Sequence, residues 1–164
     1  MDKKSYEEIS ELAKKQEELL RFPHFNNKDA WDLGCFLVQR IYEKQIELSV
    51  AIRKLNGSII FQYGTEQTNQ NNINWMKRKF NTVALMERSS YGAWAASLAS
   101  GETVLTHGLN ENEYVFCGGG FPIRLTTGEI VAVLTVSNLP HEEDHRFMID
   151  ALKDWLNVED VPFI

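Results

Sequence analysis

The dipeptide Asn56-Gly57 is the feature of this sequence that most restricts its fold. Apolar and polar residues alternate from 48 to 53 before it, and an apolar, β-rich run from 58 to 61 follows it. Asn-Gly supplies the positive φ angles of a type I′ turn, so this segment predicts a β-hairpin. The middle of the chain is therefore expected to contribute two adjacent antiparallel strands.

Helical periodicity flanks this hairpin on both sides. Apolar residues recur every three or four positions, which predicts helices over 5–20, 28–46 and 73–88. A short, buried helix over 89–100 is expected to end at Gly101, and a last helix is expected to begin at Pro140. Further strands are predicted at 114–117, 121–125 and 130–136.

The order of these elements predicts the fold class. Two helices, two strands, two helices, three strands and one helix do not alternate strictly, so a doubly wound parallel sheet is excluded. We expect an α+β fold with a mostly antiparallel sheet of about five strands and helices on its faces. With no internal repeat and no linker, residues 1–164 are expected to form a single domain, on which the N-terminal helices of 1–46 pack.

Charge and hydropathy exclude several classes of partner. Seventeen basic and 23 acidic residues give a net charge of −6, the opposite of a general nucleic-acid or anionic-membrane binder. The longest stretch without a charged side chain, Ser89 to Gly101, is too short to span a bilayer. The first twenty residues are amphipathic and charged, without an apolar signal core. We therefore expect a cytoplasmic protein with reduced cysteines, and no nucleic-acid or membrane partner.

The run Gly118-Gly119-Gly120, preceded by Cys117 and followed by Phe121, is the most unusual local motif. Successive glycine N–H groups can form an anion-binding nest, whereas a tight bulged corner is the structural alternative. Neither nucleotide-binding fingerprint is present, and the absence of a GxSxG nucleophile elbow argues against acyl-transfer hydrolysis. Beside glycine amides, the pKa of the Cys117 thiol is lowered in one interpretation, while in the other the thiol is buried and inert.

Two histidines open the last predicted helix. His141 and His145 are four residues apart, the spacing of two-histidine metal sites, and Cys117 or His107 are the possible further ligands. The alternative is an acidic, solvated first turn with no metal. The sequence alone does not supply an evident third ligand, so both histidines remain weak candidates.

Positive charge is concentrated on the predicted helix over 73–88. Lys77, Arg78, Lys79 and Arg88 lie there in an otherwise acidic chain. Arg78, with Asn81 one turn later, has the chemistry to hold a carboxylate or a phosphate by charge-assisted hydrogen bonds. The alternative interpretation is a solvated helix face, or a group of residues that form salt bridges between subunits.

Four separated motifs together resemble the uncharacterised UPF0303 group, within the wider GlcG, HbpS and PduO C-terminal superfamily. The motifs are Asn74-Trp75-Met76-Lys77-Arg78-Lys79, Ser89-Ser90-Tyr91, Gly118-Gly119-Gly120-Phe121-Pro122-Ile123 and Leu139-Pro140-His141-Glu142-Glu143-Asp144-His145. The resemblance implies a profilin-like α/β/α fold, a single GlcG-like domain and assembly into dimers or larger rings. It also implies a possible link to haem, since some members bind haem or are connected with its degradation. Members often carry His where this chain has Cys117.

These observations lead to one main functional hypothesis and two alternatives. The main hypothesis is an oligomeric module that binds a small anionic metabolite between the glycine run and the Arg78 face. The first alternative is a structural or adaptor protein whose role is to form the oligomeric assembly. The second is a haem-binding or haem-degrading protein with His141, His145 or Cys117 as ligand. No convincing catalytic constellation is evident, so enzymatic activity stays open. The candidate ligand-binding residues are Gly118, Gly119, Gly120, Phe121, Arg78, Asn81 and Cys117.

Overall fold

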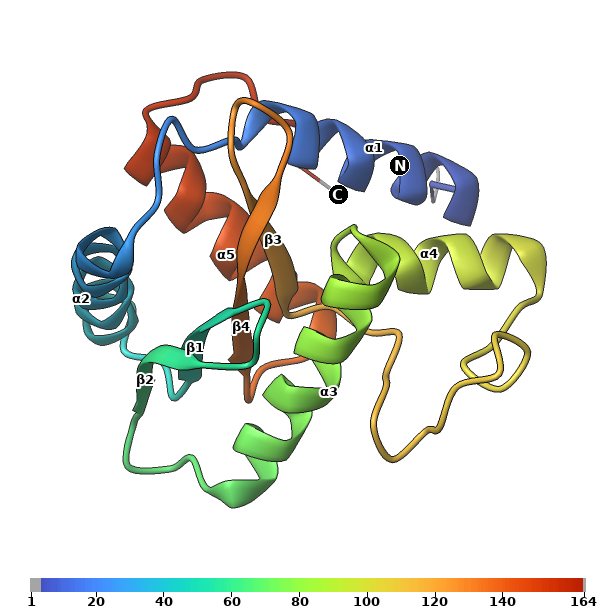
Figure 1. The fold of residues 1–164 in the computed structure, drawn as a ribbon, viewed down its shortest axis with the longest axis horizontal. Helices are drawn as coiled ribbons and strands as arrows, with labels where there is room; N and C mark the ends of the chain where they lie inside the picture. Colours follow the sequence, from blue (N-terminus) through green and yellow to red (C-terminus); the bar gives the residue numbers. More distant parts are fainter. Residues whose placement is uncertain (1–3, 164) are drawn as a thin grey trace.

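Four antiparallel strands form a sheet in the order β2-β1-β4-β3 in the computed structural model, which describes residues 4–163 (Figure 1). The strands are β1 (Ser49–Lys54), β2 (Ile59–Gly64), β3 (Gly120–Arg124) and β4 (Ile130–Ser137). The helices are α1 (Tyr6–Leu19), α2 (Asn27–Glu43), α3 (Gln70–Met86), α4 (Ser90–Ser100) and α5 (His141–Leu156). The predicted α+β class is confirmed. Within the described residues, no helix combines the length and apolar character needed to cross a membrane.

The predicted hairpin is present, but its turn differs from the expected type. Gly57 has a φ of +91°, whereas Asn56 is not among the residues with positive φ, so the turn is not type I′. Instead, the Lys54 carbonyl accepts the Gly57 N–H at 2.8 Å and the Lys54 N–H donates to Ser58 at 2.9 Å. This is a three-residue loop with the positive φ confined to glycine. The Asn56 side chain stabilises it by accepting the Ser58 N–H at 3.0 Å.

The first four helices of the described chain begin at polar residues that favour helix starts, whereas α5 begins at Pro140. Ser5 and Glu8 form a capping box at α1, and Asn26 and Asp29 form another at α2. The short helix α4 ends, as predicted, at Gly101 in the left-handed region. These local signals explain why the helix positions follow the sequence periodicity.

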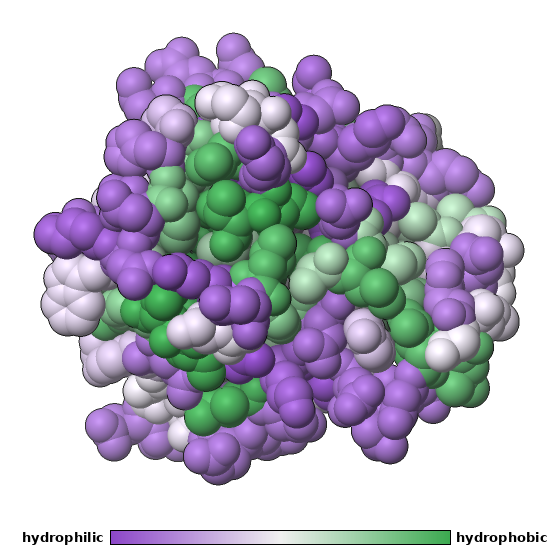
Figure 2. Space-filling model, in the orientation of Figure 1, coloured by the Kyte–Doolittle hydropathy of each residue, from purple (hydrophilic) through white to green (hydrophobic). Residues whose placement is uncertain are grey.

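Helices cover both faces of the sheet. Helices α2 and α5 pack with the sheet around the larger apolar core, whereas α3 crosses the other face over a smaller cluster of Phe80, Val83 and Val133. Helix α1 lies alongside α4 (Figure 1). Figure 2 shows hydrophobic residues gathered at the centre of this face of the molecule, with hydrophilic residues around them. The arrangement places the N-terminus of α5 next to α3 at the end of β4.

The predicted strand over 114–117 does not form, so the expectation of about five strands is wrong and the sheet of the described chain has four. The backbone of this segment bonds to α3 instead of to a neighbouring strand. Thr82 Oγ1 donates to the Val115 carbonyl at 2.7 Å, and Asn81 Nδ2 donates to the Glu113 carbonyl at 2.8 Å. The β-rich composition is overridden because side chains of α3 supply the hydrogen-bond partners.

Candidate functional site

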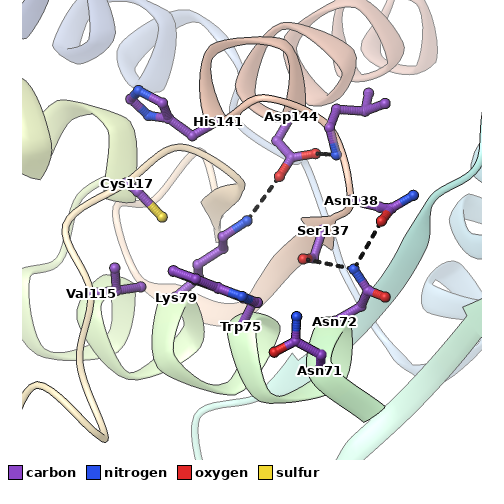
Figure 3. Close-up of a pocket in the computed structure, with 11 residues that line it drawn as sticks. Asn71, Asn72, Trp75, Lys79, Val115, Cys117, Ser137, Asn138, His141 and Asp144 are labelled. Atoms are coloured by element: carbon purple, nitrogen blue, oxygen red, sulfur yellow. Dashed lines mark hydrogen bonds and ion pairs between the residues drawn. The ribbon is translucent and has the colours of Figure 1, made fainter. Parts of the chain in front are cut away.

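A cavity of about 460 Å³ lies where α3, the end of β4, the start of α5 and the segment before β3 meet (Figure 3). Its walls combine one ion pair, several amides, a hydroxyl, an indole and a thiol. The lining residues are Asn71, Asn72, Trp75, Lys79, Val115, Cys117, Ser137, Asn138, Leu139, His141 and Asp144.

The ion pair between Lys79 and Asp144 is the most buried polar feature of this cavity. The Lys79 ammonium lies 2.9 Å from Asp144 Oδ2, and the two side chains are only 3% and 2% exposed. Lys79 Nζ also donates to the Val136 carbonyl at 2.9 Å, and Asp144 Oδ1 accepts the Leu139 N–H at 3.1 Å. The pair therefore joins α3, β4 and α5 at one point.

Burial sets the protonation of this pair. Desolvation raises the pKa of Asp144 to about 6, although the charge and hydrogen bond of Lys79 act in the opposite direction. Asp144 is consequently ionised at neutral pH but takes up a proton in mildly acidic solution. The charge state of the cavity thus changes close to the physiological range.

Amides and a hydroxyl form the wall opposite the ion pair, as Figure 3 shows. Asn72 Nδ2 donates to Ser137 Oγ at 3.4 Å and to Asn138 Oδ1 at 3.3 Å. Trp75 adds a flat apolar surface, and the Arg78 guanidinium lies over its ring at 4.5 Å from the centroid. This mixture of polar groups and one aromatic plane is typical of sites for small polar molecules.

The glycine run packs behind the cavity wall instead of lining the cavity. The Gly118 N–H donates to His141 Nδ1 at 3.1 Å, and the Gly120 N–H donates to Ser90 Oγ at 2.8 Å. A Cβ atom on Gly119 would lie 2.5 Å from Lys79 Nζ. Two of the three amides expected to form an anion nest are thus already bonded within the chain. Glycine is required here because helices α3, α4 and α5 approach the backbone closely.

The remaining predicted ligand-binding residues are dispersed. Cys117 lines the cavity, but Arg78 and Asn81 are not among its lining residues. Asn81 instead holds the segment before β3, and Phe121 is fully buried in the core. The structure therefore brings only Cys117 of the predicted set to this cavity.

Of the two interpretations of Cys117, the lowered pKa is wrong and the buried thiol is supported. Burial raises the pKa of this thiol, and this effect exceeds the opposing influence of the Lys79 charge. The thiol is therefore protonated at neutral pH and acts as a weakly polar wall of the cavity.

The two histidines of α5 have internal roles. His145 is 2% exposed, its Nε2 lies 2.8 Å from Gln16 Oε1, and its ring stacks on Tyr91 with centroids 4.7 Å apart. Burial lowers its pKa to about 3, so it is neutral, and a solvated helix start is the wrong description of this residue. Across residues 4–163, no three His, Cys, Asp or Glu side chains gather closely enough to hold a metal.

Sequence reasoning missed the partnership of Lys79 and Asp144. In the sequence Lys79 belongs to a run of three cations that is typical of a solvated face, although it lies three residues after Met76 and four before Val83. That spacing puts it on the buried stripe of α3, and a lysine on such a stripe requires a buried acceptor. The spacing therefore indicates that Lys79 is buried. It does not identify the acceptor, because Asp144 is 65 positions away.

The architecture around this cavity is shared with several solved structures. The crystal structure of the Ybr137w protein has a TM-score of 0.81 at 24% identity, over 94% of this chain and 90% of that one. The crystal structure of HbpS has a TM-score of 0.64 at 17% identity, over 83% and 92% of the two chains. The fold thus defines an α+β protein of the HbpS type.

Sequence comparison assigns the family within this class. The family described as "Haem degrading protein HbpS-like" matches residues 25–153. A UPF0303 protein of Yersinia enterocolitica is 33% identical over 89% of this chain and 87% of its own length. A UPF0303 protein of Psychromonas ingrahamii is 36% identical over 85% and 87%. The chain belongs to the UPF0303 group of the HbpS-like family.

The family description raises the question of haem, and the structure of PduOC, 18% identical with a TM-score of 0.65, is a haem complex. The residues that line the present cavity do not fit this group. His141 Nδ1 already accepts the Gly118 N–H, and its ring packs edge-on against Trp94 with centroids 4.7 Å apart. Cys117 is a protonated thiol because burial raises its pKa, and the Lys79–Asp144 ion pair forms part of the cavity wall. A porphyrin needs an available axial ligand and apolar walls.

Proposed function

We propose that this chain is a binding protein for a small carboxylate-bearing metabolite, held in the cavity between α3 and α5. The observation that carries this proposal is the incomplete bonding of Lys79. An ammonium group has three donors, and the structure pairs two of them, with Val136 and Asp144. The third has no acceptor in the described part of the chain. Because the ammonium is buried, a ligand carboxylate that accepts this third bond would relieve an unsatisfied donor.

The start of α5 also supports an anionic ligand. Leu139 and His141, which flank the N-cap Pro140, both line the cavity. No side chain caps this helix, and the Pro140 carbonyl accepts the N–H groups of Glu143 and Asp144. The N–H groups of His141 and Glu142 are therefore left for a ligand at the positive end of the helix dipole. The volume of about 460 Å³ lies within the range of roughly 300–1,000 Å³ that is typical of small-molecule sites.

A ligand screen tests this proposal. Purified protein is titrated with a panel of mono- and dicarboxylates, keto acids and nucleotides while its melting temperature is followed. A ligand that occupies the cavity at about one hundred times its dissociation constant stabilises by about 2.7 kcal/mol, which is readily detected. If no carboxylate raises the melting temperature at saturation, or if nucleotides alone do so, the proposal is refuted.

Two variants connect binding with the cavity. Lys79→Met removes the donor, and Val115→Trp fills the space without changing any charge, so both are expected to abolish the thermal shift. Lys77→Met is the matched control, because Lys77 lies on the same helix but is exposed. A carboxylate that still stabilises folded Val115→Trp protein as strongly as the wild type would show that it binds elsewhere.

A second candidate function, assembly of several copies, is favoured by an aromatic surface on α2 and the edge strand β2. Trp31, Tyr42, Ile59 and Tyr63 are 58%, 55%, 46% and 38% exposed there. An edge strand flanked by exposed aromatic side chains is suited to contact a second copy of the chain. Native mass spectrometry tests this: Trp31→Glu is expected to lower the number of subunits. Leu85→Glu, at an equally exposed position on α3, is expected to leave it unchanged.

A further inference from the structure

A second hollow, of about 500 Å³, is bounded by α1, the turn between α3 and α4, and the end of β3. It is separate from the Lys79 cavity and shares no lining residue with it. Every residue that lines it is charged: four are carboxylates and four are cations. The cations are Lys14, Arg21, Arg88 and Arg124.

These four cations are not neutralised by ion pairs. In the part of the chain that the structure describes, no carboxylate oxygen lies within 4.0 Å of Lys14, Arg21, Arg88 or Arg124. The guanidinium of Arg21 makes no hydrogen bond there, and the Nε atoms of Arg21 and Arg88 are buried without a partner. These two Nε atoms are closed to solvent, so the donors that remain available to a ligand are the Nη groups, and those of Arg21 have no acceptor in the described part of the chain.

Two of the guanidinium groups are held in place by other contacts. Arg124 donates to the carbonyls of Gly128 at 2.9 Å and Glu87 at 2.8 Å. Arg88 donates to Ser10 Oγ at 3.1 Å. Each guanidinium has five N–H donors, so both retain free donors after these bonds. Groups fixed in this way lose little side-chain entropy when they bind a ligand.

The arginine side chains and most of the glutamate side chains lie at different depths in the hollow. The three arginines are partly buried, whereas Glu11, Glu18 and Glu87 are exposed at the rim, where water screens their charge. Glu17 is the buried carboxylate. It accepts the Ser89 N–H at the start of α4, and burial raises its pKa, although the charges of Arg88 and Arg124 act in the opposite direction. In the interior of the hollow, three partly buried guanidinium groups therefore accompany one buried carboxylate.

We propose that this hollow is a binding site for the phosphate group of a small phosphorylated metabolite, held by Arg21, Arg88 and Arg124. The planar, forked guanidinium matches phosphate oxygens, and several unpaired guanidinium groups around one space favour a ligand with more than one negative charge. Such a ligand accepts hydrogen bonds from the Nη groups of Arg21 and from the donors that Arg88 and Arg124 retain. The site is independent of the carboxylate-binding function proposed for the Lys79 cavity.

Calorimetric titration with inorganic phosphate and with pyrophosphate tests this site. Both are expected to bind the wild-type protein, and the affinity is expected to fall as the salt concentration rises. Arg21→Gln is expected to weaken binding by about tenfold or more, the loss of one charge-assisted contact. Lys28→Gln is the control, because Lys28 is an exposed cation on another part of the surface. Val115→Trp is expected to bind phosphate normally, which distinguishes this site from the first cavity.

Nuclear magnetic resonance gives a second test that needs no variant. Phosphate is expected to shift the side-chain Nε–Hε signals of Arg21 and Arg88 and the amide signals at the start of α4, while signals around Lys79 stay in place. Absence of phosphate binding would overturn the proposal. It would also be overturned if Arg21→Gln and Lys28→Gln bound equally well, or if the shifts clustered away from this hollow.

Discussion

Removal of the Lys79 ammonium is the perturbation whose outcome the structure defines most sharply. In Lys79→Met the Asp144 carboxylate stays buried without its cation, and breaking a buried pair in this way costs about 3–5 kcal/mol. For a domain of this length, each kcal/mol corresponds to about 2–4 °C, so the melting temperature should fall by roughly 6–20 °C near pH 8. Urea unfolding followed by tryptophan fluorescence measures the same loss as a free energy.

The loss in Lys79→Met should depend on pH with a definite sign. The pKa of Asp144 is raised from its ordinary value of 3.8 to about 6 in the folded protein. Its contribution to stability is therefore largest below the ordinary pKa and is lost as the pH rises through about 6. Lys79→Met, which lacks the lowering influence of the cation, is expected to recover stability as the pH falls, because Asp144 becomes neutral.

Asp144→Asn provides the matched comparison. It removes the titrating carboxyl, so its loss relative to the wild type should not shrink as the pH falls from 8 to 5, because only the wild-type protein gains stability when Asp144 takes up a proton. The double variant Lys79→Met/Asp144→Asn should lose less than either single variant, since no buried charge remains. A Lys79→Met loss that is equal at pH 5 and pH 8, or a double variant whose loss equals the sum of the two, would refute this reasoning.

Two further predictions concern the segment before β3. Gly118→Ala places a Cβ atom 2.1 Å from the backbone oxygen of His141, so it is expected to destabilise the protein by about 1–3 kcal/mol in the same urea assay. An unchanged unfolding midpoint would show that the backbone around Gly118 has room for a Cβ atom, which contradicts the structure. In alkylation with iodoacetamide at pH 8, exposed Cys35 is expected to react well before Cys117, whose pKa is raised by burial. Equal rates in folded protein would contradict the placement of Cys117, and both thiols should react alike in urea.

Local signals predicted most of the secondary structure. Periodicity and capping residues located the five helices, and Asn56-Gly57 located the central hairpin, because these features depend on neighbours within a few positions. The strand predicted over 114–117 failed for the opposite reason. Its backbone partner is the hydroxyl of Thr82, which lies 33 positions before Val115 in α3. Composition favours a strand there, but tertiary contacts decide where the hydrogen bonds go.

The sequence by itself determined the α+β class, the family and the presence of an unusual glycine run. Only the tertiary structure decided what that run does: its backbone gives α3, α4 and α5 room to approach, and two of its amides bond within the chain. Only the tertiary structure, likewise, paired Lys79 with Asp144 and gathered Arg21, Arg88 and Arg124 around one hollow. Burial and charge pairing are properties of residues far apart in the chain, so no local pattern contains them.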